Sequence, residues 1–205
     1  MTDEGGGWVL AAVTAQDPWT TFARGCAAAI RERFPQCRPL LDREATRSSL
    51  DAAAPLEGLV FAGHGRADAL IGDDGGPLLD PMNAYLVSRR WVFALACSAG
   101  SVLGPALRSE GALFVGYTFA LGREPVAAEH LEALFAAVCA VVDALVHEGH
   151  AVKVRKPMLD VVDRFLDAHP ELLDPLALAD HPDLVLAFEW LKDLSQLQVL
   201  RPLPP

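Results

Sequence analysis

The first 120 residues contain four short runs that are almost continuously apolar, and these runs limit the possible folds more than any other feature. Runs of this kind are typical of strands buried on both faces of a parallel sheet. They lie at 8–15, 59–62, 91–96 and 112–117, and a further short strand fits at 37–41. Helical segments fit between them at 19–34, 45–54, 82–87 and 101–108. Strands that alternate with helices need crossover connections, so the sequence predicts an α/β fold with a mostly parallel sheet covered on both faces.

The chain after Pro125 is mainly helical. Apolar residues recur at three- and four-residue intervals across 131–146, and two more helices are expected at 157–168 and 184–200. The most apolar stretch, 133–146, is shorter than a bilayer requires and contains Asp143, so it predicts a buried helix and no membrane span. At 205 residues the chain is short for two independent domains, so we expect one domain across 1–205, with frayed ends at 1–7 and 201–205.

Charge and composition exclude several classes of function. The formal charge is −10, and the 17 lysines and arginines form no dense run, so nucleic-acid binding is not expected. The N-terminus is acidic and glycine-rich where a signal peptide has a basic and then an apolar segment, which predicts a cytoplasmic protein. The four cysteines lack the spacing of a zinc site, so we expect reduced thiols and neither a metal nor another cofactor.

A histidine and a cysteine each lie directly after a predicted strand. His64 stands between two glycines after 59–62, and Cys97 follows 91–96. Taken singly, such a cysteine is usually a small core residue and such a histidine a turn residue. Together, at the carboxyl ends of strands about 5 Å apart, the thiol and the imidazole would face one cleft. An imidazolium lowers the pKa of a neighbouring thiol and can protonate a leaving amine, so we predict a catalytic dyad of His64 and Cys97.

Small groups around the predicted dyad favour an oxyanion hole. The residues at 98–100 are small and open a predicted helix, whose N–H groups favour both a thiolate and a developing oxyanion. Gly65 has no side chain to prevent its N–H from approaching a substrate carbonyl. We therefore assign the backbone N–H groups of Gly65 and Cys97 to this role.

Residues 59–117 resemble the caspase-like (clan CD) cysteine peptidases. The matching pieces are an apolar strand with Gly63-His64-Gly65, a short hairpin across 69–78, and the segment 95–100 around Cys97. The chain is more similar to the bacterial CHAT-type branch, which is related to separase and gingipain-like peptidases, than to animal caspases. The resemblance implies a caspase–hemoglobinase sandwich and a cysteine endopeptidase that acts on a protein or peptide. Leu95 stands where animal caspases have glutamine, so cleavage after aspartate is not implied.

The resemblance also implies where a substrate pocket would lie. Its walls would come from the loop after the first strand and from 117–124, which places Asp17, Tyr117, Thr118 and Glu124 there. A carboxylate at a pocket base pairs with arginine or lysine, so Asp17 would select a basic side chain on the amino side of the cut. Helix capping before Pro18 explains Asp17 at least as well, and Arg123 could instead select an acidic side chain.

Two further motifs favour structural roles, and two other functions compete with the peptidase. The sequence His147-Glu148-Gly149-His150 lacks zincin spacing and indicates a helix end, and 73–76 indicates a hairpin turn and not a calcium loop. A small-molecule cysteine hydrolase would place its nucleophile before its histidine, the reverse of the order here. The main alternative is a catalytically silent caspase-like module that binds a partner through its helical C-terminal region.

The sequence contains no evident sensor domain or inhibitory linker. An unregulated peptidase would endanger its cell, so we expect control in trans by a companion sensor protein that docks on the helical segment after residue 125. A bacterial defence or cell-death system would suit such a pair.

Overall fold

The computed structural model describes residues 7–121, 125–149, 153–174 and 177–203. The chain divides into two compact units, the first comprising Met1–Leu121 with Gln198–Pro205 and the second Gly122–Leu197. This division does not establish that either unit folds alone, so the single-domain expectation stays a prediction.

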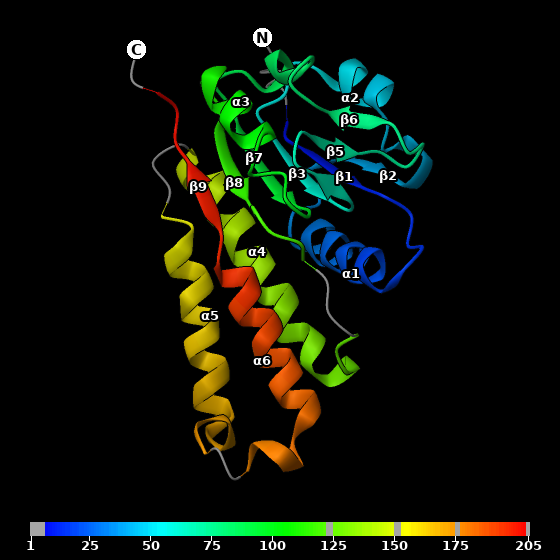
Figure 1. The fold of residues 1–205 in the computed structure, drawn as a ribbon. Helices are drawn as coiled ribbons and strands as arrows, with labels where there is room; N and C mark the ends of the chain where they lie inside the picture. The colour runs from blue at the N-terminus through cyan, green and yellow to red at the C-terminus, as the bar shows by residue number, and fades with distance from the viewer. Residues whose placement is uncertain (1–6, 122–124, 150–152, 175–176, 204–205) are drawn as a thin grey trace. The chain divides into compact units, whose positions relative to one another are not determined.

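A six-stranded sheet forms the centre of the first unit, with strand order β2-β1-β3-β7-β8-β9 (Figure 1). Its strands are β1 (Val9–Ala12), β2 (Arg38–Leu41), β3 (Gly58–Ala62), β7 (Trp91–Leu95), β8 (Leu113–Gly116) and β9 (Gln198–Leu200). All neighbours are parallel except β8 and β9, which are antiparallel. Every residue of β1, β3, β7 and β8 is buried, which accounts for their continuous apolar sequences and confirms the mostly parallel sheet.

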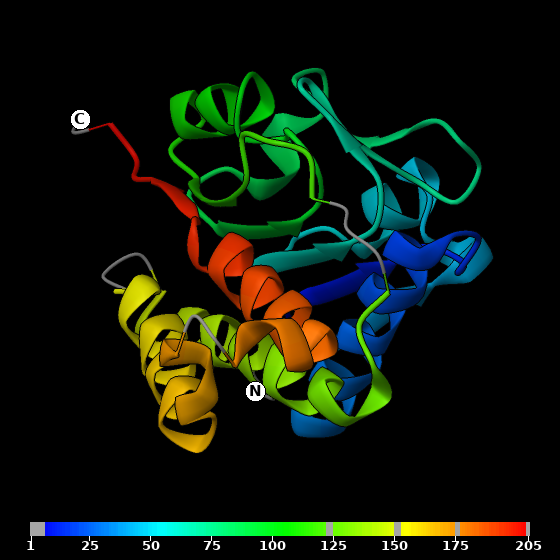
Figure 2. The same cartoon turned by 60° about the horizontal axis from the view of Figure 1, so that its bottom comes forward.

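Helices cover both faces of this sheet. The helix α1 (Pro18–Arg33) packs against β1 and β3, while α2 (Arg47–Ala53) and α3 (Leu103–Ser109) share an apolar cluster with the opposite face (Figures 1 and 2). Phe61 and Phe114 are central, fully buried members of that cluster. Two 3₁₀ segments, η1 (Asp42–Glu44) and η2 (Ala84–Val87), complete the connections, so only the end of the helix predicted at 82–87 is helical.

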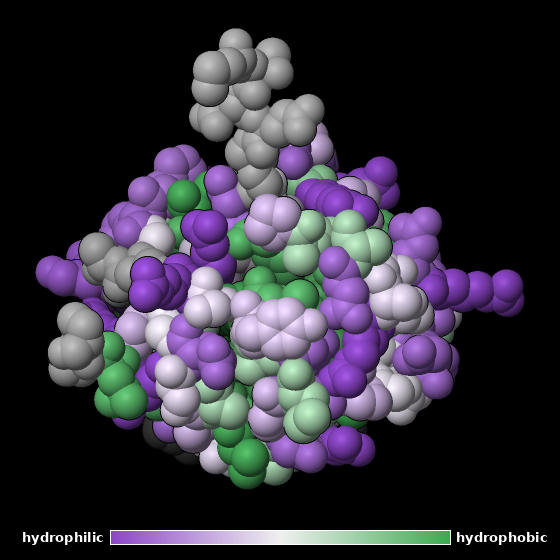
Figure 3. Space-filling model, turned by 90° about the horizontal axis from the view of Figure 1, so that it is seen from above, coloured by the Kyte–Doolittle hydropathy of each residue, from purple (hydrophilic) through white to green (hydrophobic). Residues whose placement is uncertain are grey.

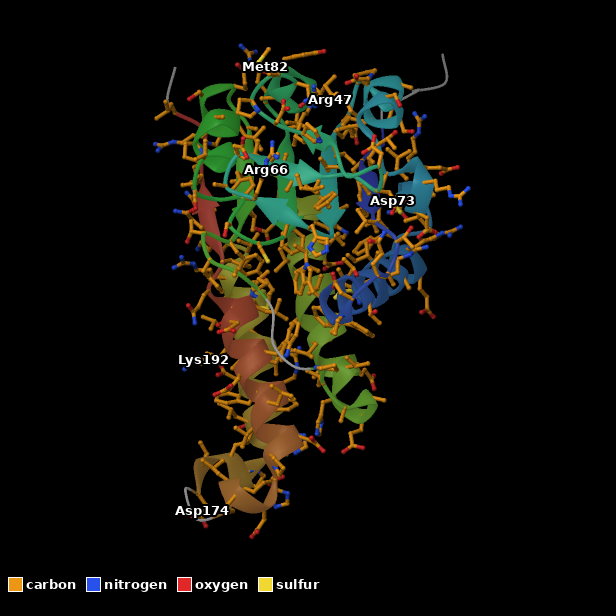
Figure 4. The ribbon with its side chains drawn as sticks, turned by 45° about the vertical axis from the view of Figure 1, so that its right-hand side comes forward. Arg47, Arg66, Asp73, Met82, Asp174 and Lys192 are labelled. Atoms are coloured by element: carbon orange, nitrogen blue, oxygen red, sulfur yellow. The ribbon has the colours of Figure 1, made fainter. Side chains whose placement is uncertain are left out.

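A small antiparallel sheet follows His64 immediately. Its strands are β4 (Gly65–Arg66), β5 (Ala69–Ile71) and β6 (Pro77–Leu79), which confirms the predicted hairpin. Gly75 has a φ of +77° in its turn, a conformation that favours glycine. Asp73, labelled with Arg66 in Figure 4, accepts a 2.6 Å hydrogen bond from the N–H of Thr14 and thereby holds the hairpin beside the end of β1.

The surface of the first unit is mixed, as the view from above shows (Figure 3). Two large apolar side chains after β6 are strongly exposed, Met82 at 80% and Tyr85 at 63%. Met82 is labelled near Arg47 in Figure 4, and Arg47 forms an ion pair with Asp80. Isolated exposed apolar side chains are normal on a protein surface, so these two residues do not by themselves mark a site.

The described residues of the second unit form three α-helices, α4 (Leu131–Glu148), α5 (Arg155–Ala168) and α6 (Pro182–Ser195). The 3₁₀ segment η3 (Ala128–His130) directly precedes α4, and η5 (Pro170–Leu173) and η6 (Leu178–Asp180) lie between α5 and α6. The helix α4 packs against both α5 and α6. It ends at Glu148 before Gly149, whose φ is 55°, so the predicted helix end is confirmed.

The segment Ala128–Glu148 is one described helix that is long and apolar enough to cross a membrane by length and composition. An 18-residue window of this segment has a mean hydropathy of 1.6, and 44% of the window is buried inside the structure. The core helix of a soluble protein meets the same test, and α4 packs against two helices of its own unit.

The end of the chain corrects one expectation. A helix was expected to continue through 184–200, but α6 ends at Ser195 and β9 (Gln198–Leu200) pairs with β8. Leucines recur at helical spacing up to Leu200, which gives the helical pattern. The exposed edge of β8 instead offers backbone partners for the last residues, and such tertiary pairing overrides local propensity.

Candidate active site

The structure brings His64 and Cys97 to the same edge of the large sheet. The strands β3 and β7 are adjacent and parallel, with Ala62 opposite Leu95. The N–H of the next residue, Gly63, donates to the carbonyl oxygen of Leu95 at 3.2 Å, so the two chains leave the sheet together. The expectation that these strands are neighbours is therefore confirmed.

Gly65 lies directly against the backbone of the cysteine. A Cβ atom at Gly65 would come within 2.6 Å of the carbonyl oxygen of Cys97 and 2.9 Å of the Cβ of Ala96. Real Cβ atoms do not approach backbone so closely, which makes glycine a packing requirement at this position. This contact links the His64 and Cys97 segments, and it is compatible with the oxyanion role predicted for Gly65, which stays a prediction.

The Cys97 thiol is bonded to the backbone of Leu121. Its Sγ donates to the Leu121 carbonyl oxygen at 3.0 Å and accepts from the Leu121 N–H at 3.2 Å. Burial raises the pKa of Cys97 above its usual value, and the hydrogen bond from Leu121 offsets only part of this effect. In this arrangement Cys97 is therefore held as a neutral thiol.

A sharp turn follows Cys97. Ser98 has a φ of 56°, which is uncommon for a residue with a side chain. Two hydrogen bonds hold the turn, from the Ser98 N–H to the Phe119 carbonyl (2.9 Å) and from the Gly100 N–H to the Tyr117 carbonyl (2.7 Å). Strain of this kind persists only where the surroundings fix it, and here the segment after β8 does so.

Asp17 contacts the imidazole of His64. The distance between Asp17 Oδ2 and His64 Nε2 is 2.9 Å, with the side chains 39% and 50% exposed. The N–H of Thr20 donates to Asp17 Oδ1 and lowers the pKa of Asp17, to which His64 also contributes. An anionic Asp17 makes Nε2–H the donor, and this leaves Nδ1 as the nitrogen able to exchange a proton.

Two further residues of the site have no obvious signal in the sequence. Trp19 donates its Nε1–H to the carbonyl oxygen of Gly63 at 2.9 Å and so fixes the residue before His64. Leu121 holds the thiol through its backbone, which no side-chain pattern can reveal. Both contacts join segments that are distant in the sequence.

The residues predicted to line a substrate pocket have different environments. Asp17 is the N-cap of α1, so the capping interpretation is confirmed. The side chain of Tyr117 is fully buried and packs edge-on against Phe119, so a substrate contact by its ring would require this segment to move. Thr118 is exposed, and Glu124 lies outside the described residues. The substrate-binding roles of these four residues stay predictions.

In the described ranges, no group of three or more histidine, cysteine or acidic side chains is arranged to hold a metal ion. Of the four cysteines, Cys97 is partly exposed, whereas Cys26, Cys37 and Cys139 are buried. Cys97 is therefore the thiol that a reagent in solution can reach first.

We expect Asp17→Ala to lower the free energy of unfolding by about 1 kcal/mol, because it removes the helix cap, whereas Asp17→Asn should keep the cap and most of the stability. The lowered pKa of Asp17 means that its ionised form stabilises the fold above roughly pH 3.9, and that this contribution is lost as the pH falls through the folded-state pKa. Urea denaturation at pH 7 and pH 3 measures both effects. Equal stabilities of the Asn and Ala variants at pH 7 would contradict the capping role.

No family model and no curated protein matches the chain. Among solved structures, the chain is similar to the Arg-specific cysteine proteinase gingipain R, with a TM-score of 0.55 and 12% sequence identity. The match covers 94% of this chain and 45% of the gingipain R chain, so the chain spans less than half the length of that structure. At this identity the likeness shows the fold alone: the chain folds like this cysteine proteinase.

Proposed function

We propose that the chain is a cysteine endopeptidase that cleaves a protein partner through a dyad of His64 and Cys97. The observation that carries this proposal is the placement of both residues at the ends of adjacent parallel strands, linked through the close contact of Gly65 with Cys97. The similarity in fold to a cysteine proteinase supports the same reaction class. Function on a shared fold still depends on the site, so activity requires its own test.

The reaction would proceed through an acyl-enzyme. His64 takes the proton of the Cys97 thiol, the resulting thiolate attacks the carbonyl carbon of the scissile bond, and the N–H groups of Gly65 and Cys97 stabilise the oxyanion. His64 protonates the leaving amine, the C–N bond breaks, and a thioester with Cys97 remains. Water then hydrolyses the thioester and regenerates the thiol. Asp17 acts as a positioning residue in this scheme because it fixes the ring orientation of His64.

We expect the peptidase to prefer arginine or lysine on the amino side of the cut. The half-exposed carboxylate of Asp17 lies beside His64, and gingipain R, which is similar in fold, is described as Arg-specific. A positional scanning library measures the preference in the wild type, in Asp17→Ala and in Asp17→Asn, which keeps the helix cap. Loss of the basic preference in both variants supports a pocket role for Asp17. A wild-type preference for aspartate or an aliphatic residue contradicts it.

Control in trans by a companion protein fits the resting state of the thiol, which is neutral and bonded to Leu121. The helical second unit is the segment on which such a sensor would dock, in a cytoplasmic bacterial defence or cell-death system. Activity of the isolated chain on its native substrate that no companion changes would count against this control.

The second candidate is a catalytically silent module with a caspase-like fold. The observation in its favour is the same neutral, bonded thiol, since a silent protein needs no release of Cys97. The two functions differ in one measurable property: only the peptidase requires His64-dependent reactivity of Cys97.

A further inference from the structure

The segment 117–121 follows β8, and Leu121 at its end contacts the thiol of Cys97. Leu121 bonds the thiol with both of its backbone groups: its carbonyl oxygen accepts a hydrogen bond from the S–H, and its N–H donates one to a lone pair of the sulfur. A thiol that attacks a substrate needs that lone pair free and that proton removed. The backbone groups of Leu121 therefore engage both the proton and the lone pair of Cys97 that the proposed reaction requires.

Independent contacts hold this segment in place. The carbonyls of Tyr117 and Phe119 accept from the Gly100 and Ser98 N–H groups, and the Tyr117 and Phe119 rings pack edge-on at 5.7 Å. The side chain of Leu121 is only 4% exposed, so burial of an apolar side chain anchors the end that carries the two bonding groups. The arrangement is thus a packed segment and not a chance contact of a free loop.

We propose that segment 117–121 is a latch that keeps Cys97 in a resting form until the segment is displaced. This inference rests on the proposed peptidase function, because a latch matters only if Cys97 reacts. Displacement of Leu121 would free the sulfur, admit water or His64 to the proton, and open the place that a substrate backbone must occupy. The chain passes from the first unit to the second directly after Leu121, so a partner that binds the second unit can act on the latch through the chain itself.

The latch predicts how the wild-type thiol reacts. Burial raises the pKa of Cys97 by more than the hydrogen bond from the Leu121 N–H lowers it, so the rate of Cys97 alkylation by iodoacetamide should rise with a midpoint above about pH 8.5, the value of an unperturbed cysteine. Mass mapping assigns the label, and the three buried cysteines serve as internal controls. A midpoint below pH 7 in the wild-type chain would overturn the latch.

A variant tests the latch directly. Leu121→Gly removes the buried anchor and loosens the segment without altering Cys97, His64 or Gly65. We expect Cys97 to be alkylated at least about tenfold faster at pH 7.5, as the loss of one or two hydrogen bonds of ordinary strength implies. Leu203→Gly makes the same substitution at an exposed leucine and should leave the rate unchanged. An unchanged rate in a folded Leu121→Gly chain would overturn the proposal, and the wild-type pH midpoint decides the matter if that variant does not fold.

Adding His64→Ala to Leu121→Gly separates the latch from the peptidase function. If both are correct, Cys97 reacts faster in Leu121→Gly and the second substitution removes most of the gain at neutral pH. If only the latch is correct, the gain survives without His64 and no peptide is cleaved. If the latch proposal is wrong, the alkylation rate of Cys97 in Leu121→Gly equals that of the wild type. The His64–Cys97 dyad can then still be tested by peptide hydrolysis.

Discussion

Replacement of Cys97 by alanine is expected to lower kcat for peptide hydrolysis by about 10⁴-fold or more, because it removes the proposed nucleophile that forms the acyl intermediate. The fold should persist, since the substitution removes only the sulfur and its two hydrogen bonds to Leu121. Hydrolysis of a peptide library is compared in the wild-type and Leu121→Gly backgrounds, with circular dichroism as the check on folding.

Cys26→Ala is the matched control, because it removes a thiol that is buried in α1. It should leave hydrolysis within a few-fold of the wild type. Activity that survives in a purified, folded Cys97→Ala chain would assign the reaction to another residue or to a contaminant.

Replacement of His64 by alanine is expected to lower kcat by about 10³-fold or more, since general acid–base catalysis contributes roughly 10²–10⁴-fold and thiolate formation is lost as well. His64 is half exposed and its ring contacts Asp17, so the loss should not unfold the chain. Initial rates over a pH range measure the effect, because hydroxide replaces part of the missing base at high pH.

His147→Ala is the matched control for this variant. His147 is an exposed residue at the end of α4, and its imidazole lies near Asp143 as His64 lies near Asp17. It should keep the full rate. Equal losses in the two variants, or none in His64→Ala, would contradict the dyad.

The sheet could be predicted because burial on both faces leaves a direct mark in the sequence. Every residue of β3 and β7 is buried, and every one is apolar apart from the glycine that begins β3. The strands and their parallel arrangement therefore follow from the pattern. β9 leaves no such mark, since its three residues are only partly buried and continue the leucine spacing of α6. Its place depends on a partner more than 80 residues earlier in the chain.

The placement of His64 and Cys97 could also be predicted, because the strand ends of a parallel sheet meet at one edge. The contact of Asp17 with His64 and the bonds of Leu121 to Cys97 join residues 47 and 24 positions apart. Such contacts depend on how loops pack. Leu121 contacts Cys97 through backbone groups that every residue type has except proline, so the residue type at position 121 does not predict this contact.

Reaction with a peptide chloromethyl ketone that ends in arginine, followed by mass mapping of the modified residue, tests the central claim most directly. The account predicts that Cys97 is modified in preference to Cys26, Cys37 and Cys139, that Leu121→Gly accelerates the reaction, and that His64→Ala suppresses it in both backgrounds. Labelling spread over several cysteines, or labelling of Cys97 at the same rate without His64, would contradict a His64–Cys97 peptidase.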